Sequence, residues 1–302
     1  MAISIYVIKK YVKILSGKSV FTVNQDEGKF YSKDEVKGYY NNLTEKITRF
    51  GKPGIELPLT HVARDMNIYF SIEIFQYGLA AYDLYIKTNS QDYLDKFRAT
   101  VDWALTNQDE KGRWETFPYK RKDQLYSSMA QGEAISLLTR AYKEWGDIKY
   151  KNAAKKSKDF MLLPVEEGGT TVYHDGKIYL YEYLHEDQVL NGWIFSAWGI
   201  YDYAKCFNDQ EAWNQWNNTI NAMSEKLWMY DRKIWSSYTD GKKWANPFYH
   251  KLHVAQLNVM YDLTGNNTFK IYAEKFAKYQ KNRLYRIIAF LYKIWQKTTD
   301  NS

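Results

Sequence analysis

The chain contains a carboxylate next to a phenol at Glu182-Tyr183, shortly before the stretch Val189-Leu190-Asn191-Gly192. A Glu and a Tyr together can remove a proton from a carbon atom and return one, provided that both side chains are desolvated and aimed at that carbon. Further along the chain, the side chains of Tyr238, Tyr249 and His250 can also donate or accept a proton. Since each of these residue types is common by itself, their significance depends on the elements that bring them together.

Four segments of the chain resemble one another at a period close to 60 residues. Their marker tyrosines are Tyr82, Tyr142, Tyr201 and Tyr261, which gives steps of 60, 59 and 60 residues between those positions. A constant period of this size indicates stacked supersecondary units. Each unit consists of an apolar helix rich in small residues, a polar turn and a more charged amphipathic helix. The amphipathic helices are expected at about 91–107, 149–162, 210–229 and 268–280.

This alternation predicts a mainly α protein, an (α/α) toroid of about four helical hairpins. Helices that are apolar nearly all round are buried, and amphipathic helices cover them. The loops that enter the inner helices are long, and loops of such length in a compact domain are usually functional. They are expected at about 108–126, 164–190 and 230–250. Two of these loops are expected to be β-hairpins, because Asp175-Gly176 and Asp240-Gly241 separate aromatic-rich strands.

The inner helices of a toroid all begin at one end, so the loops that enter them share that end. Glu182-Tyr183 closes the second long loop, whereas Tyr238, Tyr249 and His250 belong to the third. We therefore expect these residues to converge from two loops. A phenol has an ordinary pKa of about 10 and acts first as an acid, and a nearby cation favours its ionised form. The cations expected to do this are Lys242, Lys243 or Lys251.

The composition excludes several classes of function. The chain has 302 residues, of which 45% are hydrophobic and 18% aromatic, enough for a sizeable core in one or two domains. The single cysteine, Cys206, excludes an internal disulfide and suggests a reducing compartment or indifference to redox state. The five histidines show no zinc spacing, and there is no phosphate-binding loop or dinucleotide glycine fingerprint. We therefore expect no metal and no cofactor.

The net charge of +7 points to an acidic polymer as a partner. The basic residues crowd both ends of the chain, and the body between them is closer to neutral, so charge alone identifies no nucleic-acid groove. No nucleic-acid-binding motif is present, and we expect no nucleic-acid partner. An anionic polysaccharide and an anionic membrane surface are the acidic partners left open at this point. A homodimer is left open. Neither end has the pattern of a signal peptide or a membrane span, which predicts a cytoplasmic protein.

Three parts are expected along the chain. Residues 1–60 are a lead-in that is partly β, residues 61–282 are the toroid, and residues 283–302 are a basic amphipathic tail. A helix of the tail's kind either lies on an anionic membrane surface or packs on the body of the protein. The basic ends thus predict peripheral contact with the inner membrane surface as one alternative.

The motifs resemble those of the D-glucuronyl C5-epimerases, the enzymes of heparan sulfate and heparosan modification. The similarity covers about residues 60–265, in order and with compatible gaps. It runs through Tyr69-Phe70-Ser71-Ile72-Glu73-Ile74-Phe75-Gln76-Tyr77-Gly78-Leu79, Ser128-Met129-Ala130-Gln131-Gly132, Tyr181-Glu182-Tyr183, Val189-Leu190-Asn191-Gly192 and Tyr249-His250…His253…Gln256-Leu257. Several motifs in register are far more specific than any one of them. The family's C-terminal domain is a toroid of four helical hairpins, in agreement with the repeat.

The resemblance implies inversion at C5 of D-glucuronic acid residues in a heparosan-like polysaccharide, which gives L-iduronic acid. It implies catalytic roles for Glu182, Tyr183, Tyr238 and Tyr249. It implies substrate contacts at Ser128, Met129, Asn191, Phe195 and His250. The family arginine beyond the hairpin tyrosine has no clear match, and Lys242 or Lys243 is expected to substitute for it. The calcium of eukaryotic relatives has no support in this sequence.

The division of labour among these residues stays open at this point. One division makes Glu182 the base on one face of the sugar and Tyr249 the acid/base on the other, with Tyr183 and Tyr238 assisting. A polysaccharide lyase would form the same C5 carbanion and then expel the O4 substituent. A glycoside hydrolase would need a second carboxylate, Glu133 or Glu186, opposite Glu182. A toroid that only binds acidic polysaccharide needs no turnover.

Overall fold

The computed structural model describes residues 24–49, 54–63, 66–241 and 243–299. The chain divides into two compact units. The large unit comprises residues 28–223, and the small unit comprises residues 1–27 with 224–302, of which the structure describes 24–27, 224–241 and 243–299. The division falls within the last turn of helix α8 (Gln210–Lys226). It crosses the three-part division expected from the sequence.

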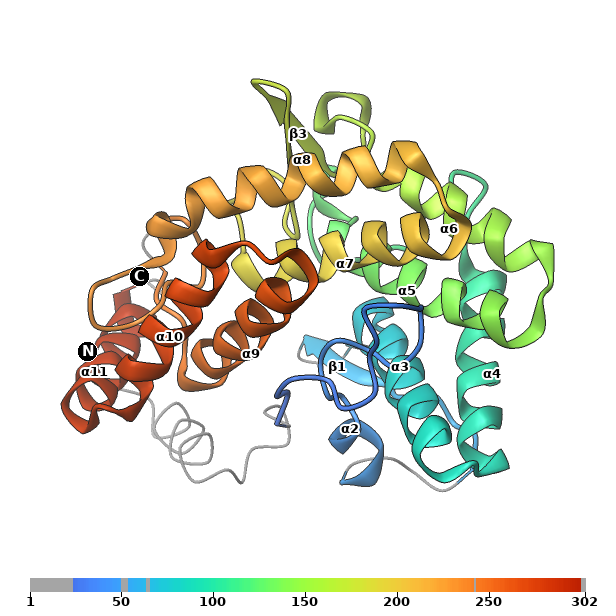
Figure 1. Ribbon diagram of the computed structural model, residues 1–302, viewed down its shortest axis with the longest axis horizontal. Coiled ribbons are helices and arrows are strands. Elements are labelled where there is room, and N and C mark those ends of the chain that lie inside the picture. The colour runs from blue at the N-terminus through green and yellow to red at the C-terminus, as the bar shows by residue number, and fades with distance from the viewer. Residues whose placement is uncertain (1–23, 50–53, 64–65, 242, 300–302) are drawn as a thin grey trace. The chain divides into compact units, whose positions relative to one another are not determined.

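Helical hairpins make up most of both units (Figure 1). Four helices are largely buried and have the same length of 18 residues: α3 (Ser71–Thr88), α5 (Ser128–Trp145), α7 (Leu190–Phe207) and α9 (Pro247–Thr264). Each is followed by a more exposed helix: α4 (Gln91–Asn107), α6 (Ile148–Met161), α8 and α10 (Asn267–Lys281). The expected alternation of inner and outer helices is confirmed, and the outer helices begin within one residue of their expected positions.

The same local device turns the chain between the two helices of every hairpin. Each inner helix ends at a residue in the left-handed conformation, where Asn or Gly is favoured: Asn89, Gly146, Asn208 and Gly265. The next residue is at the N-cap position of the outer helix, and its side chain accepts a first-turn amide hydrogen bond in three of the four hairpins, Ser90 being the exception. Asp147 accepts a hydrogen bond from the Lys149 amide at 2.9 Å, and Asn266 accepts one from the Thr268 amide at 2.9 Å. A left-handed residue followed by a cap thus encodes each turn locally.

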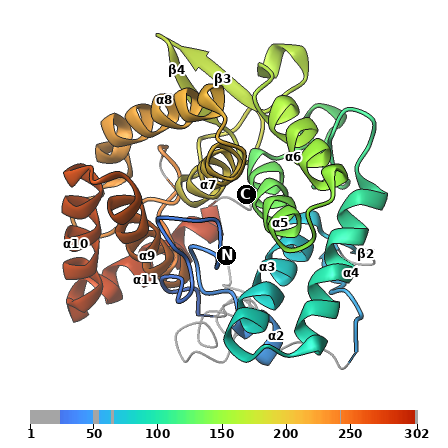
Figure 2. The same ribbon diagram turned by 45° about the vertical axis from the view of Figure 1, so that its right-hand side comes forward.

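Close contacts between inner helices organise the large unit. Helix α3 packs on α5 and α5 packs on α7, so the three lie in sequence order with α4 and α6 outside them (Figure 2). Two glycines allow the backbones of α5 and α7 to approach. A Cβ at Gly132 would lie 2.5 Å from the Ser196 Cα, and one at Gly199 would lie 2.4 Å from the Gly132 carbonyl oxygen. The Gln-Gly signal at the start of α5 is therefore a packing requirement.

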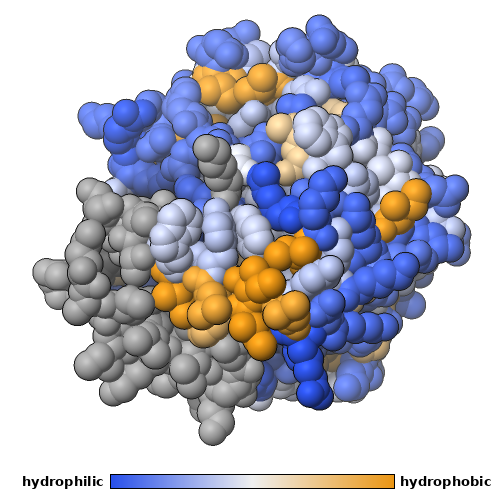
Figure 3. Space-filling model, turned by 90° about the vertical axis from the view of Figure 1, so that its left-hand side faces the viewer, coloured by the Kyte–Doolittle hydropathy of each residue, from blue (hydrophilic) through white to orange (hydrophobic). Residues whose placement is uncertain are grey.

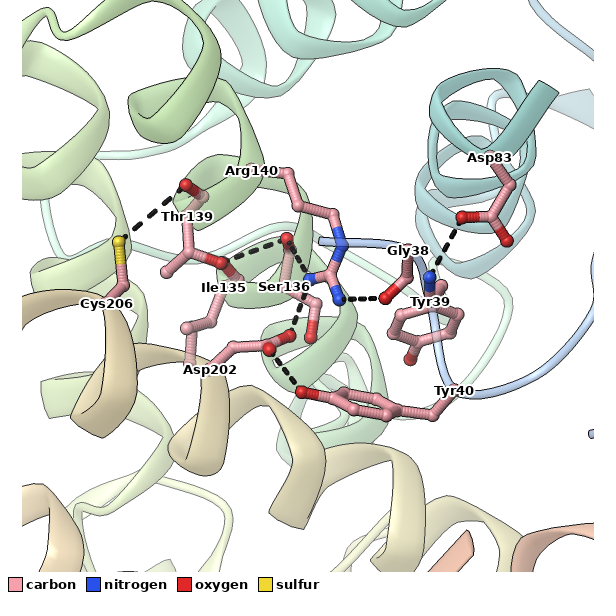
Figure 4. A network of polar contacts seen from close by, with 10 residues as sticks. All are labelled: Gly38, Tyr39, Tyr40, Asp83, Ile135, Ser136, Thr139, Arg140, Asp202 and Cys206. Atoms are coloured by element: carbon pink, nitrogen blue, oxygen red, sulfur yellow. Dashed lines mark hydrogen bonds and ion pairs between the residues drawn. The ribbon is translucent and has the colours of Figure 1, made fainter. Parts of the chain in front are cut away.

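A buried polar network ties residues 38–40 to all three inner helices of the large unit (Figure 4). Arg140 of α5 forms an ion pair of 2.6 Å with Asp202 of α7 and donates to the Gly38 carbonyl at 2.9 Å. The Tyr40 hydroxyl donates to the other Asp202 oxygen at 2.6 Å, and the Tyr39 amide donates to Asp83 of α3 at 2.9 Å. Because each charge has partners, the desolvated groups are compensated.

This network changes the expectation for residues 1–60. Residues 28–49 pack into the large unit and contain the short helix α2 (Glu45–Thr48). No strand is present among the described residues before Thr60, so the expected β content begins only at the end of that range. The segment pairs with itself only at single points, since the Gly38 amide donates to the Phe30 carbonyl at 3.1 Å and the Gly28 amide to the Tyr40 carbonyl at 2.8 Å. The Gly38 carbonyl and the Tyr39 amide bond to helix side chains. Residues 1–23 lie outside the described part of the chain.

Short strands occur next to the helix starts. Strands β1 (Thr60–Ala63) and β2 (Met66–Ile68) pair, and so do β3 (Thr171–His174) and β4 (Lys177–Leu180). The second pair is the hairpin expected at Asp175-Gly176, where both residues have positive φ, 49° and 71°. The hairpin expected around Asp240-Gly241 is reduced to the isolated bridges Asp231↔Ser236 and Ser237↔Trp244. Short 3₁₀ helices lie at Lys122–Gln124, Val165–Glu167 and Leu227–Tyr230.

The expected basic tail forms helix α11 (Arg283–Thr299), which packs on α9 and α10 in the small unit. One face of α11 carries exposed apolar side chains at helical spacing: Leu284, Ile287, Ile288, Leu291 and Trp295. Figure 3 shows a patch of apolar surface on the side from which α11 is seen. Within the described ranges, no helix has the length and apolar character needed to cross a membrane.

Candidate functional site

Glu182 lies at the junction of strand β4, helix α5 and helix α7. The Tyr181 amide donates to the Thr170 carbonyl at 3.0 Å, and the Ser128 amide at the start of α5 donates to the Tyr181 carbonyl at 3.0 Å. These two bonds fix the backbone immediately before Glu182. Because Ser128 begins α5, the backbone before Glu182 is tied to the start of an inner helix.

The side chain of Glu182 rests directly on Gly192 of α7. A Cβ at Gly192 would lie 2.3 Å from Glu182 Oε2 and 2.8 Å from its Cβ, so only glycine leaves room for the carboxyl group. The glycine of the stretch Asn191-Gly192 is thereby explained, because the Glu182 side chain packs against it. Oε2 is buried and has no hydrogen-bond partner among the described residues. A buried carboxylate oxygen without a hydrogen-bond donor is poorly stabilised as an anion, which makes the carboxylate a stronger proton acceptor.

Burial raises the pKa of Glu182 to about 7. A hydrogen bond from the Tyr183 side chain and the positive charge of Lys120 lower this pKa, and the charge of Glu186 raises it further. Desolvation is the largest cause, since a buried carboxylate loses its hydration. A carboxyl group with a pKa near the working pH is suited to general base catalysis, because it is partly ionised and still basic.

Tyr183 is held by the long loop that enters α5. Its ring stacks on Phe117 with a centroid distance of 4.8 Å and an interplanar angle of 25°. The ammonium group of Lys120 lies 4.4 Å from the centre of the Tyr183 ring and forms an ion pair with Glu186 at 2.5 Å. The Gln124 side chain donates to the Leu184 carbonyl at 3.0 Å. The loops at 108–127 and 181–189 therefore form one joined structure around Glu182-Tyr183.

The sequence did not single out two residues of this loop that act on Glu182. Lys120 lowers the pKa of Glu182, and the Glu182 charge in turn helps to raise the pKa of Tyr119, after the effect of burial. Both follow Phe117-Pro118 in a loop whose length had suggested function. The available signal was a phenol and a cation in that loop. Tyr119 and Lys120 were missed because the 60-residue repeat of the sequence does not show which loop residues lie near Glu182.

Glu133 of α5 is a fully buried carboxyl group in the same unit. Its Oε1 accepts a hydrogen bond from the Gln76 side chain of α3 at 2.7 Å, and its Oε2 has no partner among the described residues. Burial raises the pKa of Glu133 well above its ordinary value, and the charge of Glu182 adds to this rise. Burial therefore favours the protonated form of Glu133, and its side chain has no contact with solvent.

The residues for which the resemblance implied substrate contacts in this unit are buried. They are Ser128, Met129, Asn191 and Phe195. The Ser196 hydroxyl donates to the Ser128 hydroxyl at 2.8 Å, and Phe195 packs in parallel with Tyr39 at 6.3 Å. In this structure these side chains are part of the packed interior of the large unit. Their contact with a substrate stays a prediction.

Tyr238 and Tyr249 lie together in the small unit. Their ring centres are 4.7 Å apart at an interplanar angle of 53°. The Tyr238 amide donates to the Lys243 carbonyl at 2.6 Å, which sets the loop. Asn246 caps helix α9 by accepting from the Tyr249 amide at 3.0 Å, and Pro247 begins the helix. The two phenols of the third long loop are thus in contact near the start of α9, and their expected convergence with Glu182 stays a prediction.

His250 has an internal position next to this pair of phenols. The Ser236 amide donates to His250 Nδ1 at 3.1 Å, so the other ring nitrogen, Nε2, carries the hydrogen and donates to the Phe276 carbonyl at 3.0 Å. The ring stacks on Trp235 at 3.6 Å, and burial lowers the pKa of His250 to about 3. His250 is neutral and fully enclosed, and it fixes Ser236, two residues before Tyr238.

The second histidine of this helix supports the same residue. His253 Nδ1 lies 2.9 Å from the Ser236 hydroxyl, and burial lowers the pKa of His253 to about 3. The two histidines therefore form a neutral clamp on the loop. Of the three lysines expected nearby, Lys243 and Lys251 are exposed, and Lys242 lies outside the described residues.

The structure thus brings the predicted residues together in two sets. Glu182 and Tyr183 belong to the large unit, and Tyr238, Tyr249 and His250 belong to the small unit. Each set has a fixed geometry within its own unit. Among the residues that the structure describes, no cluster of three or more His, Cys, Asp or Glu side chains is arranged to hold a metal ion.

Comparison with known proteins links this arrangement to one family. The model of the D-glucuronyl C5-epimerase C-terminus matches residues 108–278. The chain is 31% identical over 168 residues to the D-glucuronyl C5-epimerase of Caenorhabditis elegans, a match that covers 48% of this chain and 27% of the relative. It is 28% identical over 157 residues to an uncharacterized protein of Methanocaldococcus jannaschii, covering 50% of this chain and 51% of that protein. The chain therefore spans about a quarter to a half of these curated relatives.

Among solved structures, the chain is similar to the cellobiose 2-epimerase of Bacillus thermoamylovorans. The TM-score is 0.51 with 14% sequence identity, over 70% of this chain and 59% of that structure. At this level of identity the likeness concerns the fold alone. It agrees with the repeated helical hairpins that the sequence predicted.

Proposed function

This chain belongs to the D-glucuronyl C5-epimerase family, and we propose that it is an isomerase that inverts C5 of D-glucuronic acid residues within a polysaccharide. The product is L-iduronic acid in the same polymer. The observation that carries the proposal is the Glu182 carboxyl group, which is buried on Gly192, has a pKa of about 7 and is bonded to the Tyr183 phenol. A general base of this kind suits removal of a proton from carbon.

The reaction needs one proton to leave C5 and one to return from the opposite face. The C5–H bond breaks toward the base, and its electron pair moves into the bond between C5 and the carboxylate carbon. A second negative charge then develops on the carboxylate oxygens, which the site must stabilise with donors or cations. A proton delivered to the other face of C5 completes the inversion. No electron is transferred, so the proposed reaction requires no redox cofactor.

We assign Glu182 to one face of the sugar, with Tyr183 assisting. The unpartnered Oε2 takes the proton, while the hydrogen bond from Tyr183 and the Lys120 charge favour the ionised carboxylate before the reaction. The resemblance to the family makes Tyr249, with Tyr238 assisting, the candidate for the second acid/base group. The contact between the Tyr238 and Tyr249 rings supports this pairing, because one phenol orients the other.

The neutral histidine clamp has a positioning role in this proposal. His250 and His253 hold Ser236, and thereby the loop that carries Tyr238. A neutral ring near Tyr238 does not raise or lower the phenol's acidity through charge. The net charge of +7 favours an acidic polymer, and we propose a heparosan-like chain as the substrate.

Proton NMR of heparosan incubated with the protein in D2O tests the proposal. An epimerase incorporates deuterium at C5 and produces iduronate signals. A lyase produces an unsaturated uronate instead, a hydrolase produces new reducing ends, and a protein that only binds leaves the polymer unchanged. Glu182→Gln is the matched variant, since it keeps the side-chain shape but removes the basic oxygen. Wild-type protein that gives neither C5 exchange nor iduronate would refute the proposed activity.

A further inference from the structure

Lys120 occupies a position beside both members of the Glu182-Tyr183 pair. Its ammonium group lies 4.4 Å from the centre of the Tyr183 ring and 5.6 Å from that of Phe117, at one edge of the stack formed by those two rings. The charge of Lys120 also lowers the pKa of Glu182. Lys120 is therefore the cation of the large unit whose field reaches the proposed base.

The present partner of Lys120 is a carboxylate at the protein surface. Lys120 Nζ lies 2.5 Å from Glu186 Oε1, and the two side chains are 21% and 34% exposed. Ion pairs at this degree of exposure are weak, because water competes for both charges. The ammonium group can therefore exchange one carboxylate for another without leaving a buried charge unpaired.

The Glu186 carboxylate is the same chemical group as the carboxylate of a uronic acid. It is planar, singly charged and joined to a carbon chain. Glu186 raises the pKa of Glu182 whereas Lys120 lowers it. If a uronate carboxylate replaced Glu186 at Lys120, the ammonium group would lie next to the charge that develops when C5 loses its proton. Charge stabilisation at that point lowers the barrier.

We propose that Lys120 is a catalytic residue that binds the carboxylate of the uronate residue undergoing reaction, in the place that Glu186 occupies in the free protein. This inference rests on the proposed function for the identity of the substrate. It assigns to a residue of the loop before α5 the cation role that the sequence had led us to expect from Lys242 or Lys243. The ammonium group of Lys120 lies over the Tyr183 ring, which itself stacks on Phe117.

Binding of two matched oligosaccharides tests the contact directly. One is a heparosan oligosaccharide, and the other is its carboxyl-reduced analogue, in which each uronate is a neutral glucose. Dissociation constants are measured by calorimetry for wild type, Lys120→Gln, Lys120→Arg, Glu186→Gln and the control Lys122→Gln. Lys122 is exposed and two residues away, so its replacement removes the same charge from the same loop.

A direct contact predicts a specific loss. Lys120→Gln should weaken binding of the uronate ligand by about ten-fold or more, as for a lost hydrogen bond to a charged group, and change binding of the reduced ligand far less. Lys120→Arg should restore most of the affinity. Glu186→Gln should tighten only uronate binding, since it removes the competing carboxylate. Lys122→Gln should weaken uronate binding by less than about three-fold, because an exposed charge contributes little.

Other results would overturn the inference. Equal losses for the two ligands in Lys120→Gln would show that Lys120 acts only through the structure of the loop, as would an unchanged affinity for the uronate ligand. If wild type binds the uronate ligand but shows no C5 exchange, the proposed epimerase activity fails while the binding role of Lys120 is still decided by the ligand pair. Wild type that binds neither ligand overturns both.

Discussion

Replacement of Gly192 by alanine should inactivate the protein while leaving it folded. An ideal Cβ at this position lies 2.3 Å from Glu182 Oε2, 2.8 Å from Glu182 Cβ and 3.1 Å from Cδ. Non-bonded carbon atoms prefer separations of about 3.5–4.0 Å, so the Glu182 side chain must move by roughly 1 Å. A misplacement of about 1 Å at a reacting group can reduce a rate by about 100-fold.

The effect on stability should be small because two changes oppose each other. Alanine in a helix interior is favoured over glycine by about 1 kcal/mol. A side chain pushed away from its rotamer costs about 0.5–1.5 kcal/mol. The free energy of unfolding of Gly192→Ala should therefore stay within about 1 kcal/mol of wild type, while the rate of C5 hydrogen exchange falls by about 100-fold.

Gly132→Ala provides the matched comparison. Its Cβ would meet the Ser196 backbone, with 2.5 Å to Cα, and backbone cannot move aside as a side chain can. Overpacking of this kind costs about 1–3 kcal/mol, so Gly132→Ala should lose stability. The assays are urea unfolding and deuterium exchange at C5 of heparosan. Full activity in Gly192→Ala would refute the seating of Glu182 on Gly192 as a requirement for catalysis, and so would a loss of activity explained entirely by unfolding.

Three further predictions concern pH, stability and surface contact. The exchange rate should rise with pH until about pH 7, because Glu182 must be ionised to accept a proton and its pKa is raised to about 7; a pH–rate profile without this rise contradicts that role. Burial likewise raises the pKa of Asp83 from its ordinary value of 3.8 to about 7, so the folded state binds a proton that the unfolded state releases. The free energy of unfolding should therefore fall as pH increases between about 4 and 7, and Asp83→Asn should flatten this dependence in urea unfolding, whereas an unchanged slope argues against it. Finally, if α11 contacts anionic membranes, Ile287→Asp should reduce sedimentation with phosphatidylserine vesicles, whereas Ile148→Asp, at another exposed apolar position, should not. Equal sedimentation of both variants, or none by wild type, would remove the membrane contact.

Much of the fold could be predicted because its signals are local. The turn of each hairpin is encoded by a left-handed Asn or Gly and the capping residue after it, and four copies at constant spacing reinforce one another. Asp175-Gly176 predicted a hairpin for the same reason. Asp240-Gly241 did not produce full strands, because the flanking backbone bonds to the Lys243 carbonyl at one point and to His250 at another.

The sequence predicted which residues belong to the candidate site, but not how deeply they are buried or which charged groups lie near them. The pairing of Tyr238 with Tyr249, and the position of Glu182 at the start of an inner helix, follow from where the long loops end. The burial of His250 does not, since a histidine at a helix start reads equally well as a ligand or as a core residue. Lys120 was missed because it reaches Glu182 from a loop about 60 residues earlier in the chain, through the stack of Phe117 on Tyr183.

The sequence by itself determined the helical hairpins, the order of the loops and the family, because periodicity, turn residues and motif order are properties of the chain. Only the tertiary structure decided the chemistry of Glu182. Its pKa depends on how completely it is desolvated over Gly192, and on the opposing charges of Lys120 and Glu186. Desolvation and charge are set by distances in space between segments remote in sequence, so no local pattern encodes them.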